Sequence, residues 1–246
     1  MDNNILSSIK TLRSVHDDFN SKEISQSDMS QIIEYSMQAA NASNVQRYSM
    51  ILLDNCDLIF EITGKRTAKK AVIYCLDYNR IIDTANYMGL DYHPGIDNWY
   101  DIISGIFDVS ALAQTAVITA SALGIDSLIT NGVLRQDQKL VKEKLGLPSK
   151  YCIAIMAVLF GYNDKPHSDV KNRLSADLIV HNNKYKSLNP EQHEKIIREY
   201  NEIYPEYIDK SHPNYLDWFY KEWCKPMSNT LKDDLYQIIN DAGFKI

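Results

Sequence analysis

The longest helical pattern in the chain covers residues 102–123 and places the strongest constraint on the fold. The stretch is rich in Ala, Ser, Thr and Gln and carries little charge after Asp108. A helix that is apolar on nearly all of its sides must be buried, in a hydrophobic core or against another subunit. We therefore expect a central helix with packing partners around it, and Gly124 marks its end.

Short apolar runs alternate with further helical patterns along the first 162 residues. The runs predict strands at 50–53, 71–76, 127–130 and 151–160, and the last is apolar enough for a central strand buried on both faces. Hydrophobic spacing predicts helices at 5–12, 29–40, 55–63, 79–88 and 135–145. We therefore expect an α/β core over residues 1–162.

The rest of the chain has a different texture. Residues 163–185 are polar, residues 190–200 predict a charged helix, and residues 201–246 are rich in aromatic side chains. We expect this part to be an extension that wraps the core within one domain.

Composition excludes several classes of function. The chain has 246 residues and a formal net charge of −6, which argues against nucleic acid or an anionic membrane as the main partner. Residues 109–123 carry polar side chains throughout, and residues 151–162 are too few to span a bilayer. The first residues lack the basic start and apolar run of a signal peptide. A cytoplasmic protein is the expectation.

Neither a disulfide framework nor a metal site is expected. The cysteines lie far apart without a Cys-x-x-Cys pair, at Cys56, Cys75, Cys152 and Cys224, which favours a reducing compartment. The six histidines show no ligand spacing, and for each a solvated or hydrogen-bonded structural role is the default. Phosphate-loop, dinucleotide-binding, zinc-protease and nucleophile-elbow motifs are all missing. We therefore assign no catalytic residue and no metal ligand.

The segment from Ala40 to Tyr48 differs from an ordinary turn. It contains small and amide side chains and leads directly into an apolar strand, where Gly or Pro would be usual. Small residues let a backbone approach a flat ligand, and Asn and Gln offer it donors and acceptors. The segment predicts a ligand shelf, although a purely structural loop is an equal alternative.

Other segments suit a planar cofactor that carries a phosphate. Arg13, Ser14 and His16 offer a cation, a hydroxyl and an imidazole near a helix end. Lys171 and Arg173 could clamp a phosphate, although a solvated surface pair is the plainer interpretation. Asn131-Gly132 presents backbone N–H groups just after a strand.

In order and separation, these segments resemble the FMN-dependent nitroreductase family over about residues 5–185. The family's opening Arg-Arg-Ser-x-Arg is similar to residues 12–16, and its Pro-Ser-Ser-x-Asn-x-Gln motif is similar to residues 40–48. The central helix, the Gly-containing loop at 130–132 and the Leu-Gly-Leu-Pro helix end at 145–148 follow in the same order. The final 60 or so residues match no motif of the family.

The resemblance implies a nitroreductase-like α+β fold with a central mixed sheet flanked by helices. It also implies a C-terminal wrapping extension and an intertwined homodimer with two flavin sites at the interface. The implied domains are an FMN-binding domain at residues 1–185 and a helical extension of it at residues 186–246.

The same resemblance implies a role for each site residue. Arg13 and Ser14 face the phosphate or ribityl chain of FMN, and Lys171 and Arg173 close on the phosphate. Asn41, Ala42 and Asn44 line the isoalloxazine from the opposite subunit. Thr130, Asn131 and Gly132 form the loop whose backbone N–H points at flavin N5, and Lys65 lies near the pyrimidine end.

Two residues depart from the family pattern. Leu12 replaces the first Arg, which removes a phosphate ligand, and His16 replaces the Arg or Lys that normally meets flavin N1 and O2. A histidine supplies that positive charge only when it is protonated. The departures concern redox tuning more than flavin binding.

The implied activity is ping-pong transfer: NADH or NADPH gives a hydride to FMN, and a nitroaromatic, quinone-like or other small organic acceptor then takes the electrons. Two alternatives stay open. One keeps the fold for a specialised reaction such as reductive dehalogenation or metabolite dehydrogenation, and the other is a flavin carrier or redox sensor without enzymatic activity. Residues 91–100 are expected to form either a substrate lid or an aromatic surface loop.

Overall fold

The computed structural model describes residues 4–16, 18–91, 99–165, 170–225 and 235–244. The chain folds into two compact units, of which the first comprises residues 1–168 and 232–246 and the second residues 169–231. The domain boundary at residue 185 and the wrapping of the core by the extension stay predictions.

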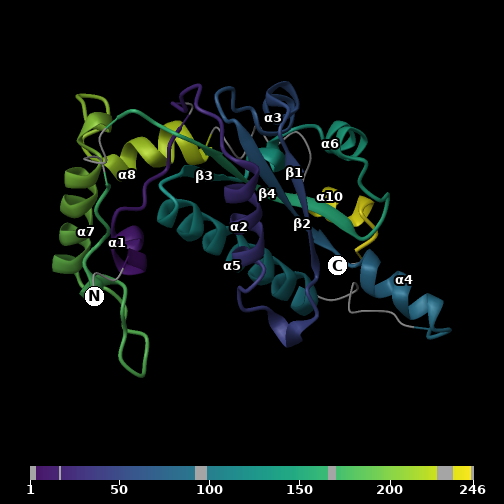
Figure 1. Ribbon diagram of the computed structural model, residues 1–246. Helices are drawn as coiled ribbons and strands as arrows, with labels where there is room; N and C mark the ends of the chain where they lie inside the picture. Colours follow the sequence, from purple (N-terminus) through teal and green to yellow (C-terminus); the bar gives the residue numbers. More distant parts are fainter. Residues whose placement is uncertain (1–3, 17, 92–98, 166–169, 226–234, 245–246) are drawn as a thin grey trace. The chain divides into compact units, whose positions relative to one another are not determined.

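The first unit is built on a four-stranded sheet (Figure 1). Its strands are β1 (Tyr48–Leu53), β2 (Lys70–Asp77), β3 (Asp126–Thr130) and β4 (Cys152–Gly161). Their spatial order is β1-β2-β4-β3, so β1 and β3 are the two edges. The apolar run predicted as a central strand is β4, and this prediction is confirmed.

The resemblance implied a mixed sheet, and this prediction is wrong for the strands that the structure describes. All three strand pairs among the described residues are antiparallel. Continuous apolar runs such as residues 71–76 are typical of parallel strands because both faces of a parallel sheet are covered. Here helices cover both faces of an antiparallel sheet, which removes the usual alternation of apolar and polar residues.

Alternate residues of the strands enter two different cores. Val72 and Tyr74 pack with helices α2 (Gln26–Ser36) and α5 (Trp99–Ala122) on one face. Ala71 and Ile73 pack on the other face with residues of α3 (Cys56–Thr63), η2 (Gly132–Arg135) and α6 (Gln138–Leu145). The result is a helix–sheet–helix sandwich (Figure 1).

Local signals determine several helix ends. The Ser25 side chain accepts a hydrogen bond from the N–H of Asp28 and begins α2, which covers Gln26–Ser36 where the pattern predicted 29–40. The Asn55 side chain begins α3, and Gly64 ends it in the left-handed conformation at φ 71°. The helix predicted from residue 135 begins later, at Gln138, because the Asp137 side chain accepts from the N–H groups of Lys139 and Leu140 in the first turn. Two further helices of this unit are α1 (Asn4–Lys10) and α4 (Asn79–Tyr87).

Helix α5 is the predicted central helix. By length and composition alone this one helix among the described residues could span a membrane, which is weak evidence because a core helix meets the same criteria. Its Val109, Leu112 and Ala116 are fully buried in the core. Tyr100, Ile103 and Phe107 are instead exposed, with 78%, 45% and 69% of their surface accessible. The helix is therefore buried on one side and presents an apolar stripe on another.

The chain returns to the first unit at its end. Helix α10 (Leu235–Asp241) and Phe244 pack against Tyr78 and Tyr151.

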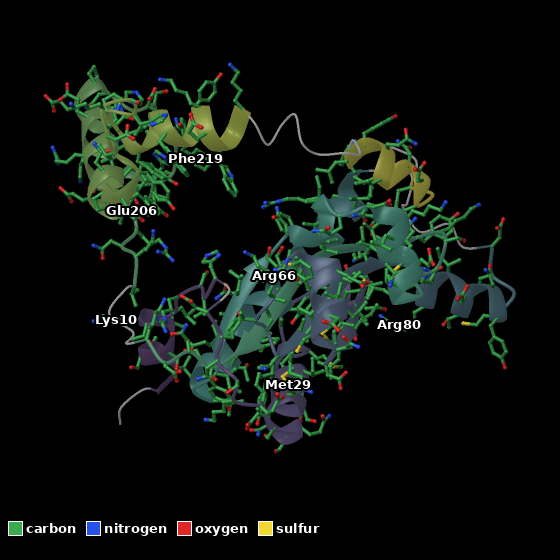
Figure 2. All side chains as sticks on the ribbon, turned by 90° about the horizontal axis from the view of Figure 1, so that it is seen from above. Lys10, Met29, Arg66, Arg80, Glu206 and Phe219 are labelled. Carbon is green, nitrogen blue, oxygen red and sulfur yellow. The ribbon has the colours of Figure 1, made fainter. Side chains whose placement is uncertain are left out.

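The second unit has its own aromatic cluster. Its elements are η4 (Ala176–Leu178), α7 (Pro190–Ile203), η5 (Pro205–Tyr207), α8 (Tyr215–Trp218) and the π-helix η6 (Phe219–Cys224). Tyr204 stacks on Tyr215 at 4.2 Å between ring centroids, and Tyr207 lies 4.0 Å from Trp218. Glu206 and Phe219 mark this unit in Figure 2.

Candidate functional site

The segment with Ser14 and His16 runs beside the edge strand β3. Ser14 forms an isolated parallel bridge with Ser127, and the N–H of Val15 donates to the Ser127 carbonyl at 3.1 Å. Val15 is buried, whereas Ser14 and His16 are exposed, as expected for an extended chain whose side chains alternate. His16 follows two residues after this bridge, and β3 ends at Thr130, three residues after Ser127.

Arg13 forms an ion pair and hydrogen bonds within the first unit. Its Nε lies 3.6 Å from Asp126 Oδ1, and the two side chains are only 10% and 9% exposed. Its Nη2 donates to the Lys165 carbonyl at 3.1 Å and to Asn163 Oδ1 at 3.4 Å. Asp126 also accepts the Asn163 N–H at 3.0 Å. Arg13 therefore ties the Ser14 segment to β3 and to the turn after β4.

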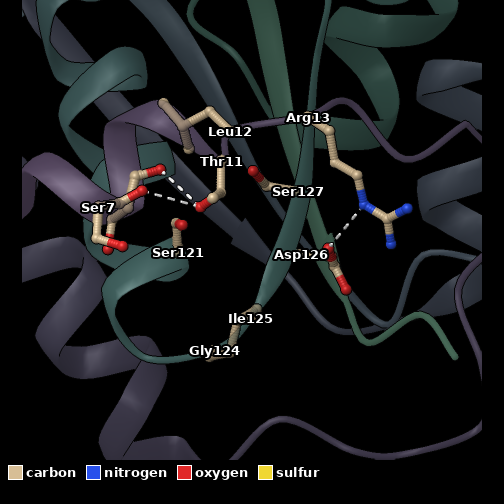
Figure 3. Close-up of a pocket in the computed structure, with 10 residues that line it drawn as sticks. Ser7, Thr11, Leu12, Arg13, Ser121, Gly124, Ile125, Asp126 and Ser127 are labelled. Carbon is tan, nitrogen blue, oxygen red and sulfur yellow. Dashed lines mark hydrogen bonds and ion pairs between the residues drawn. The ribbon is translucent and has the colours of Figure 1, made fainter. Parts of the chain in front are cut away.

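A small polar pocket adjoins this ion pair (Figure 3). Its volume is about 270 Å³, and half of its lining residues carry hydroxyl groups: Ser7, Ser8, Thr11, Ser121 and Ser127. Figure 3 shows Arg13 and Asp126 facing each other and the Thr11 hydroxyl donating to two carbonyls at the end of α1. The hydroxyl of Thr11 is thus already used within the unit.

The loop after β3 packs against the end of α3. A Cβ on Gly132 would lie 2.6 Å from the Thr63 carbonyl oxygen, so only glycine fits there. The Gly132 N–H donates to Thr130 Oγ1 at 3.0 Å, and the Lys65 N–H donates to Thr63 Oγ1 at 3.2 Å. The structure therefore brings Lys65 close to the loop at 130–132, which directly follows the strand that Ser14 bridges.

The shelf residues lie elsewhere in the first unit, just before β1. The Ala42 N–H donates to Asp108 Oδ1 at 2.7 Å, and Arg47 Nη1 donates to the Ala42 carbonyl at 3.2 Å. Asn41 is half-buried and Asn44 is exposed. Because β1 and β3 are opposite edges of the sheet, the shelf is about 14 Å or more from the Ser14 segment in the same chain, at three inter-strand spacings.

A buried tyrosine begins the strand next to the shelf. Burial of Tyr48, with a further contribution from the charge of Asp108, raises the pKa of its phenol. Tyr48 is 5% exposed, and Asp108 is 1% exposed. The sequence pattern drew no attention to Arg47 or Asp108 as site residues. The signal was present, since Asp108 is the last charge in an otherwise apolar helical stretch.

Lys171 and Arg173 belong to the second unit. Lys171 Nζ lies 3.1 Å from Glu206 Oε1 and 4.1 Å from the centroid of the Tyr204 ring. A backbone hydrogen bond of its own, together with Lys171, lowers the pKa of Glu206. The exposed Arg173 donates to the carbonyls of Lys171 and Asn172 at 2.6 and 3.2 Å. Among the described residues no carboxylate lies within 4.0 Å of the Arg173 guanidinium.

The remaining sequence expectations concern the substrate lid, the cysteines and metal binding. Residues 92–98 of the predicted lid lie outside the described residues, whereas Trp99 and Tyr100 form the first turn of α5. The cysteines are free thiols, buried at Cys75 and Cys152. In the described part of the chain no three His, Cys, Asp or Glu side chains come close enough together to hold a metal ion.

Comparison with known proteins relates this arrangement to a family. Residues 171–246 match the C-terminal domain of the nitroreductase family. The oxygen-insensitive NADPH nitroreductase of Salmonella typhimurium is 27% identical over 77% of this chain and 76% of its own length. The Cr(VI) reductase of Pseudomonas sp. is 24% identical over 91% of this chain and 90% of its own length.

A solved structure has the same fold. The NADPH:FMN oxidoreductase of Vibrio harveyi, complexed with NAD⁺, superimposes with a TM-score of 0.77 at 20% identity and covers 99% of this chain and 98% of its own. The fold, the sequence relatives and the C-terminal domain match agree with one another: the chain is similar to proteins of the nitroreductase family.

Proposed function

We propose that the protein is an FMN-dependent oxidoreductase that uses NADH or NADPH to reduce a small acceptor. One observation carries the proposal: the segment with Ser14 bridges β3, and the loop 130–132 that follows β3 packs against Thr63, two residues before Lys65. When bound, FMN supplies the hydride and electron chemistry, so the protein's task is binding, orientation and charge.

The residues present fit such a cofactor. Ser14 offers an exposed hydroxyl, His16 an exposed imidazole and Asn131 an exposed amide at one sheet edge. Arg173 offers a guanidinium without a carboxylate partner in the described part of the chain, which is the chemistry that a phosphate dianion requires. The hydroxyl and the amide suit the ribityl chain and the ring edge of FMN, and a guanidinium suits its phosphate.

The two cations of the phosphate clamp have different local partners. The charge of Lys171 is already balanced by Glu206, whereas Arg173 has no carboxylate partner among the residues that the structure describes. We therefore assign the larger phosphate interaction to Arg173. Arg13 stays a predicted phosphate or ribityl contact, and its bonds to Asp126, Asn163 and Lys165 give it a second role in holding Ser14 in place.

The loop at 130–132 and His16 would set the electronics of the cofactor. The Gly132 N–H already donates to Thr130, which makes the Asn131 N–H the better candidate to face flavin N5. His16 would hold a positive charge near N1 and O2 only in its protonated form. Lys65, fixed next to Gly132 by the end of α3, would face the pyrimidine edge.

A homodimer is part of the proposal because one chain separates the two halves of the site. The shelf lies at the β1 edge and the phosphate and ring contacts lie at the β3 edge. A second copy related by two-fold symmetry could bring its Asn41, Ala42 and Asn44 to the β3 edge of the first. The exposed stripe of Tyr100, Ile103 and Phe107 on α5 offers apolar surface for such an interface.

The acceptor is proposed by class. The relatives include an NADPH nitroreductase and a Cr(VI) reductase, so nitroaromatics, quinones and chromate are the first compounds to test. A ping-pong order fits a single flavin that serves donor and acceptor in turn. A flavin carrier is the second candidate, supported by the exposed His16 at the place of a permanent cation.

The test begins with purified protein titrated with FMN and followed by its visible absorption and fluorescence. Rapid anaerobic mixing with NADH or NADPH should bleach the flavin band, and each acceptor should restore it. Parallel lines in double-reciprocal plots would support the ping-pong order. A flavin that binds without bleaching would favour the carrier, and a protein that ignores added FMN would refute both candidates.

A further inference from the structure

The shelf has an unusual backbone for residues other than glycine. Ser43, Asn44 and Gln46 all adopt positive φ angles, of 56°, 54° and 58°. Each such residue is disfavoured by contact between Cβ and the backbone, and Asn tolerates the conformation best. A segment with three of them persists only when its surroundings hold it in place.

Two side chains hold the shelf from opposite sides of Ala42. The Ala42 N–H donates to Asp108 Oδ1 at 2.7 Å, and its carbonyl accepts from Arg47 Nη1 at 3.2 Å. Arg47 is fixed in turn by Asp101, with 3.2 Å between Nη2 and Oδ1 and side chains that are 12% and 18% exposed. Both carboxylates belong to α5, so the central helix determines where the shelf lies.

The close approach of α5 depends on Gly105, one turn before Asp108. A Cβ at Gly105 would lie 2.2 Å from Leu76 Cδ1 and 3.7 Å from Arg47 Cβ. The glycine therefore lets the helix pack directly against β2 and the Arg47 side chain. Asp101 and Asp108 reach the shelf segment because of this contact.

Packing alone does not account for a carboxylate at position 108. Asp108 is 1% exposed, and its Oδ2 has no hydrogen-bond partner among the described residues. Asn41 Oδ1 and the Tyr48 hydroxyl are also buried without a partner in that part of the chain. Burial of unpaired polar groups is costly. An apolar residue would avoid this cost, so the presence of a carboxylate at position 108 needs an explanation other than packing.

We propose that Asp108 is a positioning residue, which together with Arg47 clamps Ala42 and holds the shelf in its strained conformation before any cofactor arrives. The inference rests on the proposed function, in which Asn41 and Asn44 of the shelf contact the flavin bound at the edge of a second copy. A segment held ready in this way avoids the cost of ordering upon binding. Asp108 acts through Ala42 and does not itself touch the cofactor.

The first experiment tests the clamp in protein without flavin. Amide hydrogen exchange at Ala42 is compared in wild type, Asp108→Asn, which keeps the acceptor, and Asp108→Ala, which removes it. We expect slow exchange in the first two and exchange at least about tenfold faster in Asp108→Ala, from the loss of a charge-assisted bond. Unchanged exchange at Ala42 in Asp108→Ala would overturn the clamp.

A control on the same helix separates the clamp from general loss of packing. Ser104 is 8% exposed and donates only within α5, to the Tyr100 carbonyl at 2.8 Å. Ser104→Ala should leave Ala42 exchange at the wild-type rate. Amides of Leu112 and Ala113, in the buried part of α5, should stay protected in every variant. If these amides lost their protection in Asp108→Ala but not in Asp108→Asn, the effect would lie in the packing of the helix, and the proposal would be overturned.

The second experiment links the clamp to the cofactor. FMN affinity should fall about tenfold in Asp108→Ala and by no more than about threefold in Asp108→Asn, with Ser104→Ala unchanged. A shelf that opens in Asp108→Ala without any change in FMN affinity would show that it does not contact flavin and would overturn the inference. Failure of wild type to bind FMN would instead refute the proposed function, while exchange at Ala42 still decides the clamp.

Discussion

Substitution of Gly132 by alanine tests the loop that we place nearest the flavin ring. The new Cβ would lie 2.6 Å from the Thr63 carbonyl oxygen and 3.2 Å from Thr130 Oγ1. The first contact is with backbone at the end of α3, which cannot rotate away. The loop must therefore shift, and Thr130, Asn131 and the N–H groups that they position must shift with it.

The expected cost follows from two opposing effects. Forcing a methyl group into a packed site costs about 1–3 kcal/mol. Replacing glycine by alanine also restricts the unfolded chain, which returns about 0.4–1 kcal/mol. We expect Gly132→Ala to lower the free energy of unfolding by about 0.5–2 kcal/mol and the midpoint temperature by about 1–8 °C.

Urea unfolding of the flavin-free protein and FMN titration are the two measurements. Gly89→Ala is a matched control, because Gly89 has φ of 72° with no atom within 4 Å of an added Cβ. Alanine there should cost about 1–2 kcal/mol through the backbone alone and leave FMN affinity unchanged. Gly132→Ala should weaken FMN binding beyond this control. Wild-type stability and wild-type FMN affinity in Gly132→Ala would refute the close approach to Thr63.

The other predictions concern charge around the cofactor. Arg173→Ala should weaken FMN binding by about 1.5–3 kcal/mol and leave the affinity for riboflavin, which lacks the phosphate, unchanged. Lys171→Ala should weaken FMN binding less, because Glu206 already balances the charge of Lys171. Equal losses of FMN affinity in titrations of the two variants would contradict this order. His16→Arg should raise the flavin midpoint potential, since a permanent cation favours the more negative reduced cofactor; a potential that stays or falls in spectroelectrochemical titration counts against His16 facing the ring. Arg13→Met should lower the free energy of unfolding by about 1–3 kcal/mol because the mostly buried Asp126 loses its cationic partner. If Arg13 also binds phosphate, the affinity for FMN should fall more than that for riboflavin, and an equal fall leaves it a purely structural role.

Elements with local signals could be predicted from the sequence. The capping side chains of Ser25 and Asn55, the left-handed Gly64 and the apolar run at 151–160 each act within a few residues, so their patterns are visible in the chain. The direction of the strands could not be read in this way. Apolar runs report burial on both faces, and burial does not distinguish a parallel from an antiparallel sheet once helices cover it.

The candidate site could be predicted only as a set of residue types. Ser14, His16 and the loop 130–132 were proposed because their residue types and their order along the chain resemble the family's motifs, and their roles stay predictions. The partners of Arg13 were not found, since Asp126, Asn163 and Lys165 are more than one hundred residues away in sequence. Asp108 was noted only as the end of the charged part of a helix. Its bond to Ala42 arises from the packing of α5 beneath the shelf, which no local pattern records.

The placement of β1 and β3 on opposite borders of the sheet has a genetic consequence for the proposed dimer. A substitution in the shelf of one polypeptide would impair the cofactor site at the β3 edge of the other polypeptide. The β3 edge of the altered polypeptide would stay intact. Two differently defective alleles, one altered near Ala42 and the other near Gly132, could then restore a working site when expressed together. Activity would then depend on which two polypeptides form the dimer and not on either polypeptide alone.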